Sequence, residues 1–233
     1  MTTSMQDSST INKLILPLES GDRLTRHEFE HRYAAMPHIK KAELIEGVVY
    51  LSSPVRFRSH GQPHGHLMTW LGIYQASTPN VKLGDNATVR LDLDNEPQPD
   101  AVLLIDETLG GQARISEDDY IEGAPELVVE VAASSASIDL HDKKKAYRRN
   151  GVQEYIVWQV LDNKLDWFSL QNGEYILLEV NADGVIKSQV FPGLWLAVPA
   201  LLAGDMTKVL AVLQQGLNSI EHASFVQKFG KKE

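Results

Sequence analysis

The segment Leu127–Ala133, with the sequence LVVEVAA, most constrains how this chain folds. Every residue in it except Glu130 is apolar, and a short run of this kind, rich in Val, predicts a strand covered on both faces of a sheet. An ionised carboxylate in such a strand loses its water, which costs several kcal/mol unless a cation or strong donors replace that water. The fold must therefore bring a partner to Glu130.

Helical and strand-like patterns alternate along the rest of the chain. Helices are predicted within 21–36, from 64 onward, over 137–150 and in the tail from 206. Strands are predicted as a pair within 42–53 and singly over 89–93, 100–105, 127–133, 154–160, 164–170 and 174–180. These patterns predict a single α/β domain over residues 21–200, with a mixed β-sheet core flanked by helices. Residues 1–20 are expected to form a lead-in and residues 201–233 a helical extension.

Composition and charge exclude several classes of protein. The chain has no cysteine, so a bound metal must be held by Asp, Glu or His. The net charge of −9 argues against nonspecific coating of nucleic acid, although it allows a local basic patch. No apolar run approaches the roughly 20 residues that span a bilayer. The N-terminus also lacks the pattern of a secretory signal, so we expect a cytoplasmic protein.

Two acidic residues mark a candidate metal site. Asp100 begins one apolar strand and Glu130 lies inside the next. If these strands are neighbours, the carboxylates point into one cleft and repel each other unless a divalent cation lies between them. Oxygen ligands of this kind suit Mg²⁺ or Mn²⁺, which could activate water and offset charge on a phosphodiester. The alternative is a structural ion pair between Glu130 and an arginine such as Arg90.

The predicted helix after Glu130 offers a cation. Lys143 and Lys144 flank the apolar seam of Leu140 and Tyr147 at helical spacing, so either ammonium could enter a cleft on the sheet. A lysine there could position or deprotonate a water molecule and stabilise developing charge. Periodicity leaves both lysines open.

Two basic segments are candidates for contacts with a phosphate backbone. Residues 139–149 hold three lysines and two arginines against two aspartates, and residues 56–60 read RFRSH. This pattern favours binding of nucleic acid by four side chains, Lys144, Arg148, Arg56 and Arg58. No motif for base recognition accompanies them.

Five motifs in order carry a family resemblance: YLSSP, QPDAVLLI, PELVVEVAASS, DKKKAY and GVQEYIVW. Over about residues 22–197 they resemble the Uma family of putative restriction endonucleases, within the PD-(D/E)xK nuclease superfamily. The resemblance implies a restriction-endonuclease-like fold and Mg²⁺- or Mn²⁺-dependent cleavage of DNA. A homodimer would suit an enzyme that cuts both strands.

The resemblance also implies roles for individual residues. Asp100 and Glu130 would bind the metal, and the backbone carbonyl of Val131 would be a further ligand. The superfamily's usual lysine position holds Ala132, a departure that is disabling in the standard arrangement. The chain is similar instead to variants whose lysine lies on the following helix, four residues before a tyrosine. That position is Lys143, with Tyr147 as the tyrosine.

Further residues are expected at the border of this site. Glu43, in ELIEG, matches a family acid that would bind a second metal or a metal-bound water. His64 and Tyr147 are expected beside the site without binding the metal. Two alternatives stay open: a catalytically silent nucleic-acid-binding or scaffold protein on the same fold, and a hydrolase for RNA or nucleotides.

Overall fold

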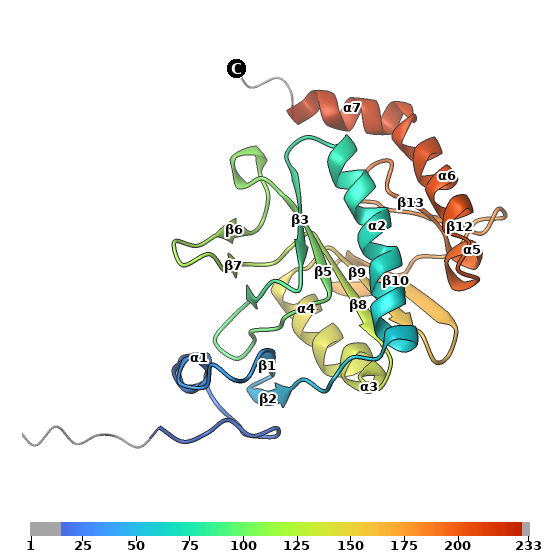
Figure 1. The fold of residues 1–233 in the computed structure, drawn as a ribbon. Coiled ribbons are helices and arrows are strands. Elements are labelled where there is room, and N and C mark those ends of the chain that lie inside the picture. Colours follow the sequence, from blue (N-terminus) through green and yellow to red (C-terminus); the bar gives the residue numbers. More distant parts are fainter. Residues whose placement is uncertain (1–14, 230–233) are drawn as a thin grey trace, which may run out of the picture.

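A six-stranded mixed sheet forms the centre of the molecule in a computed structural model that describes residues 15–229 (Figure 1). The sheet order is β11-β10-β9-β8-β5-β3, with β8 and β9 parallel and all other neighbours antiparallel. Its strands are β3 (Val81–Asp85), β5 (Ala101–Ile105), β8 (Leu127–Ala132), β9 (Glu154–Gln159), β10 (Lys164–Gln171) and β11 (Glu174–Leu177). The predicted α/β architecture with a mixed sheet is confirmed.

Strand β8 is buried along its whole length, as its apolar sequence predicts. Leu127, Val129 and Val131 join the core on one face of the sheet, while Val128 and Ala132 join the core on the other. Because side chains alternate along a strand, Glu130 points to the same face as Val128 and Ala132.

Helices cover both faces of the sheet (Figure 1). On one face lie α2 (Gln62–Ser77), α5 (Val198–Leu202) and α6 (Met206–Leu217), whose apolar residues join the core with Val129. On the other face lie α3 (Ala136–Ile138), a π-helical turn (Asp139–Lys143) and α4 (Lys144–Asn150). Gly151 ends α4 in the left-handed conformation (φ 86°), the usual role of glycine after a helix.

A small N-terminal unit packs beside α4 (Figure 1). It consists of α1 (Arg26–Ala34), capped by Thr25, and a hairpin of β1 (Ala42–Ile45) and β2 (Val48–Leu51). The hairpin turns at Glu46 and Gly47, which both have positive φ. A second π-helical turn, Phe57–Gly61, leads from the hairpin into α2.

Shorter elements complete the chain. They are β4 (Val89–Arg90), a 3₁₀ turn (Glu107–Leu109), β6 (Arg114–Ile115), β7 (Ile121–Glu122), β12 (Val185–Lys187), β13 (Trp195–Ala197) and α7 (Ile220–Phe229). No helix among the described residues is long and apolar enough to cross a membrane. Helix α6 packs on α2 and β13, so the predicted C-terminal extension shares the core, while the boundaries at residues 20 and 200 stay predictions. Most of the predicted lead-in, residues 1–14, lies outside the described residues.

Two predicted elements differ from the structure. The strand predicted over 89–93 ends at Arg90, because the carboxylate of Asp92 accepts hydrogen bonds from Asp94 and Asn95 and closes a turn. The helix predicted in the tail from residue 206 is divided into α6 and α7, and Ile220, at the start of α7, is 82% exposed. Between the two helices, the Ser219 hydroxyl accepts a hydrogen bond from the His222 N–H.

Candidate active site

Asp100 and Glu130 come together on neighbouring strands. Strand β5 runs antiparallel to β8 with Ala101 opposite Val129, and one further step in this register places Asp100 opposite Glu130. The Asp100 Oδ2 atom also accepts a 2.7 Å hydrogen bond from the Val131 N–H. Both acidic side chains are buried. The proximity that the sequence predicted for these two residues is present.

Lys143 is the cation at this point of the sheet. Its Nζ atom lies 2.9 Å from Glu43 Oε1, 3.0 Å from Glu130 Oε1 and 3.6 Å from Asp139 Oδ1. We call Glu43, Asp100, Glu130 and Asp139, together with Lys143, the carboxylate cluster. The cation that accompanies Glu130 is therefore Lys143. The predicted alternative, an ion pair between Glu130 and Arg90, is wrong.

The structure also separates Lys143 from Lys144. Lys143 ends the π-helical turn and is buried, whereas the Lys144 ammonium lies 3.6 Å from the centre of the Phe168 ring. A π-helical turn adds a residue relative to an α-helix, so it shifts which side chains face the sheet. Ideal helical spacing therefore could not distinguish Lys143 from Lys144, whereas the π-helical backbone places Lys143 in the cluster.

Tyr147 supports Glu130 from the first turn of α4. Its hydroxyl donates a 2.9 Å hydrogen bond to Glu130 Oε1, the same oxygen that Lys143 contacts. Burial and the nearby charge of Glu130 hold the pKa of Tyr147 well above its ordinary value, so this hydroxyl stays protonated. The expectation that Tyr147 lies beside the site agrees with this geometry.

The cluster contains more acids than its lysine can neutralise. Burial holds the pKa of Glu130 above its ordinary value, and the carboxylates of Asp139, Asp100 and Glu43 add to this while Lys143 opposes it. Burial works against charge on Lys143, but the surrounding carboxylates outweigh it and raise the lysine's pKa. Glu130 therefore holds its proton more tightly than an exposed glutamate does, and a further cation beside it would oppose this shift.

The pKa of Asp100 is shifted in the opposite direction from that of Glu130. Burial alone would raise its pKa, but His60, Lys41 and the Val131 N–H together lower the pKa of Asp100 to about 2. The Asp100 Oδ1 atom lies 3.2 Å from His60 Nε2 and 3.7 Å from Lys41 Nζ. The two adjacent strands thus present one ionised acid and one that holds its proton more tightly, a separation typical of catalytic sites.

Glu43 reaches the cluster from the N-terminal hairpin. Its Oε1 atom accepts a 2.7 Å hydrogen bond from the Gln98 N–H, two residues before Asp100, in addition to the contact with Lys143. The bridge between Leu44 and Glu96 fixes the hairpin against this loop. The hairpin therefore completes the site rather than only covering it.

Three members of this environment were not predicted. His60 and Lys41 were not among the expected site residues, and Asp139 was counted only as one of the two aspartates in the basic segment 139–149. Asp139 did have a signal, because it lies four residues before Lys143 and shares its helix face. His64, expected at the border, lies there: its Nε2 is 3.0 Å from the Asp100 backbone oxygen and 3.2 Å from Asp85 Oδ1.

The predicted nucleic-acid contacts fall into two groups. On the helix, Lys144 lies over Phe168, and Arg148 donates a 2.7 Å hydrogen bond to Glu174 Oε1. Arg56 and Arg58 are exposed, and neither takes part in an ion pair or side-chain hydrogen bond within residues 15–229. Binding of nucleic acid by these residues stays a prediction.

The donor set of the cluster fits a hard divalent cation. Two carboxylates, Asp100 and Glu130, lie on adjacent strands, and Asp139 Oδ1 is buried with no hydrogen-bond partner among the described residues. Mg²⁺ keeps several waters and takes one or two protein carboxylates, so this pair is sufficient. Within residues 15–229, however, no group of three or more His, Asp or Glu side chains is already arranged to hold an ion.

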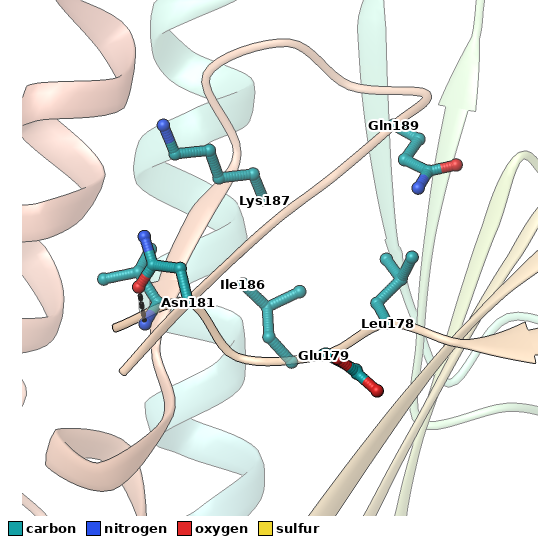
Figure 2. A pocket seen from close by; sticks show the side chains of 7 residues that line it. Leu178, Glu179, Asn181, Ile186, Lys187 and Gln189 are labelled. Atoms are coloured by element: carbon teal, nitrogen blue, oxygen red, sulfur yellow. Dashed lines mark hydrogen bonds between the residues drawn. The ribbon is translucent and has the colours of Figure 1, made fainter. Parts of the chain in front are cut away.

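A cavity of about 440 Å³ lies elsewhere, along the chain between β11 and β13 (Figure 2). It is lined by Leu178, Glu179, Asn181, Val185, Ile186, Lys187 and Gln189. None of these residues belongs to the carboxylate cluster.

Comparison with known proteins bears on both fold and family. The family model Uma2, described as "Putative restriction endonuclease", matches residues 26–199. A solved structure of a putative nuclease belonging to DUF820 from Anabaena variabilis superposes with a TM-score of 0.52 at 12% identity, covering 78% of this chain and 97% of that one. At this identity the likeness concerns the fold alone. No curated protein sequence matches the chain.

Proposed function

Because the chain belongs to the Uma2 family of putative restriction endonucleases, we propose that it is a Mg²⁺-dependent endonuclease that hydrolyses phosphodiester bonds in DNA. One observation carries the proposal. Asp100 and Glu130 lie on adjacent strands beside the buried Lys143 ammonium, 3.0 Å from Glu130. A pair of acids and a lysine at one point of a sheet combine metal ligands with a fixed positive charge.

Asp100, Glu130 and the backbone carbonyl of Val131 would hold the metal. Bound Mg²⁺ supplies a water of lowered pKa and positive charge against the phosphate oxygens. Asp100 enters this role already ionised, because His60 and Lys41 lower its pKa. The Tyr147 hydroxyl orients the Glu130 carboxylate through its 2.9 Å hydrogen bond.

Lys143 and Glu43 act next to these ligands. The Lys143 ammonium, held 2.9 Å from Glu43 and 3.0 Å from Glu130, positions a water molecule and stabilises charge that develops on the phosphate. Glu43 would bind a second metal ion or accept a hydrogen bond from a metal-bound water. Arg56 and Arg58, which have no ion-pair partner among the described residues, would hold neighbouring phosphates of the strand.

The test combines metal binding and cleavage on the same samples. Calorimetry with Mg²⁺ or Mn²⁺ and cleavage of plasmid DNA are compared for the wild type, Glu130→Gln and Glu126→Gln. Glu126 is an equally buried acid at the other end of β8, and its carboxylate accepts backbone hydrogen bonds from Ile105 and Gln112. We expect Glu130→Gln to lose both activities and Glu126→Gln to keep both. A wild type that binds no metal contradicts the proposal.

A catalytically silent nucleic-acid-binding protein is the second candidate. The observation that favours it is the closed contact of Lys143 with three acids, together with the lack of a preformed three-ligand group within residues 15–229. This candidate predicts DNA binding without cleavage at any Mg²⁺ or Mn²⁺ concentration. RNA and nucleotides, included as substrates in the same assay, test the third alternative.

A homodimer would suit an enzyme that cuts both strands of a duplex, because it would bring one site to each strand. Sedimentation of the full chain with and without a short duplex would test this. A chain that stays monomeric on DNA and yet makes double-strand breaks in a single binding event contradicts it.

A further inference from the structure

The segment Val55–Arg58, between β2 and α2, has an unusual surface. Val55 is 70% exposed and Phe57 is 72% exposed, while Arg56 and Arg58 alternate with them. Among the side chains of residues 15–228, the other exposed Phe, Tyr or Trp ring is that of Tyr120, which the Arg90 guanidinium covers at 4.1 Å. Phe57 is therefore an uncovered aromatic ring between two arginines.

This segment is tied directly to the carboxylate cluster. Phe57 begins the π-helical turn that ends at Gly61, and the backbone N–H groups of His60 and Gly61 both donate to the Arg56 carbonyl oxygen. The same turn places His60 Nε2 3.2 Å from Asp100 Oδ1. Phe57 is thus three residues before a residue that touches the cluster, within the same π-helical turn. The backbone that carries Phe57 is therefore part of an ordered element joined to the cluster.

The two arginines beside Phe57 favour binding of a negatively charged polymer. Elsewhere in the described chain most arginines are bound to carboxylates, but Arg56 and Arg58 contact none. Guanidinium groups free of carboxylates are suited to phosphate, and an aromatic ring between them is suited to the face of a nucleobase. In an intact duplex every base face is already stacked, so Phe57 can contact only a base that is unpaired or has been unstacked.

We propose that Phe57 stacks on an unpaired base while Arg56 and Arg58 bind the flanking phosphates, so that the preferred substrate is single-stranded DNA or DNA with an unpaired base beside the cleavage position. This inference rests on the proposed DNA-cleaving function and specifies its substrate. It assigns Phe57 the role of a specificity-determining residue.

The experiment measures binding in EDTA, so that cleavage does not enter. A labelled single-stranded oligonucleotide, its fully paired duplex and the same duplex with a central mismatched bubble are titrated with the full chain at several salt concentrations. The variants are Phe57→Ala, Phe57→Trp and Leu161→Ala. Leu161 is the matched control, because it is 71% exposed on the turn between β9 and β10.

We expect the wild type to bind the single strand and the bubble at least tenfold more tightly than the duplex. Phe57→Ala should weaken single-strand binding by about 5- to 150-fold, the measured range for one stacked base, and leave the salt dependence unchanged. Phe57→Trp should retain the affinity, and Leu161→Ala should match the wild type. Because both positions are exposed, all variants are expected to unfold at the wild-type temperature.

The outcomes separate this inference from the proposed function. Equal affinity for single strand and duplex, or wild-type affinity in Phe57→Ala, overturns the inference even if Mg²⁺-dependent cleavage is present. A loss in Phe57→Ala that Phe57→Trp does not restore also overturns it, because stacking requires only an aromatic face. Preferential, Phe57-dependent binding without cleavage in Mg²⁺ or Mn²⁺ supports the inference and contradicts the nuclease.

Discussion

The two basic segments of this chain, residues 56–60 and 139–149, both carry an excess of basic residues but differ in the charge that they leave available. In residues 139–149 every lysine and arginine has a partner. Lys143 contacts the carboxylate cluster, Lys144 the Phe168 ring, Lys145 and Arg149 the Glu46 carboxylate, and Arg148 the Glu174 carboxylate. Arg56 and Arg58 have no such partner within the described chain. Positive charge counted in a sequence is therefore not the positive charge available to a ligand.

The difference arises from tertiary contacts. Glu46, in the turn of the N-terminal hairpin, lies 2.8 Å from Lys145 Nζ and 2.9 Å from Arg149 Nη2. The local excess of positive charge on the helix is thus neutralised by acids remote in the sequence. The segment 55–58 follows the same hairpin, and none of its residues forms an ion pair within residues 15–229. His60, two residues beyond the segment, contacts Asp100.

The largest expected effect concerns the buried and the exposed lysine of the helical segment. Lys143→Met leaves three buried carboxylates without their cation, so we expect it to lower the free energy of unfolding by about 3–5 kcal/mol and to abolish cleavage. Lys145→Met removes a partly exposed pair and should cost at most about 1 kcal/mol. Urea unfolding of both variants measures this, and equal losses would mean that burial does not distinguish the two lysines.

The second effect is the dependence of stability on pH, which the buried acids should produce and the exposed ion pairs of the helix should not. The pKa of Glu130 is raised in the folded protein, so its contribution is present at low pH and is lost as pH rises through that pKa. Glu96 and Glu154, with pKa values raised to about 8 and about 7, act in the same direction. Without metal the free energy of unfolding should fall between about pH 5 and about pH 8, by up to about 1.4 kcal/mol per pH unit for each group.

Asp100 contributes with the opposite sign. Its pKa is lowered to about 2, so its contribution is complete above about pH 4 and is lost only in stronger acid. Calorimetric unfolding from pH 3 to pH 9 separates the two signs. Glu130→Gln should flatten the alkaline decline without removing it, and saturating Mg²⁺ should reduce the decline in the wild type but not in this variant. A decline unchanged in Glu130→Gln would assign it to Glu96 and Glu154 alone.

The sequence predicted the central sheet well, because its strands are short apolar runs bounded by clear turn residues. It also predicted that Glu130 requires a partner, since a buried acid requires compensation, and that Asp100 lies near Glu130 if their two strands are neighbours. The residues that surround Glu130 were harder to predict from the sequence. The π-helical turn that directs Lys143 inward has no periodic signature, and Glu43 reaches the cluster through the contact of a hairpin with the Gln98 loop.

The basic surface was the least predictable feature. Local charge predicted that Lys144 and Arg148 face a phosphate backbone, and nothing near them in sequence indicates Phe168 or Glu174. These partners lie on β10 and β11, two strands of the sheet that contact the helix only in the folded protein. Arg56 and Arg58 are exposed and form no ion pair within residues 15–229, and their local sequence does not reveal this. Pattern analysis therefore predicted elements and buried charge better than surface charge.

A third prediction tests whether the available charge lies on the segment 55–58. The double variant Arg56→Ala, Arg58→Ala should weaken DNA binding and lower the salt slope, log K against log salt, by about 1.4 for a single strand if each arginine binds one phosphate. The matched variant Arg148→Ala, Arg149→Ala removes equal charge and should leave the slope unchanged, since both guanidinium groups are bound to carboxylates. The reverse result would restore the helix as the DNA surface that its sequence predicted.

The smallest expected effect tests how firmly the helix charges are held. A double-mutant cycle of Glu46→Ala with Arg149→Ala, followed by urea unfolding, should give a coupling energy of about 0.2–1 kcal/mol that decreases in high salt, because Arg149 is 44% exposed. Coupling in this range means that the Glu46 carboxylate opposes capture of Arg149 by a phosphate. A coupling of zero would leave Arg149 free to bind DNA, and the contrast between the two basic segments would then be one of distance from the carboxylate cluster rather than of available charge.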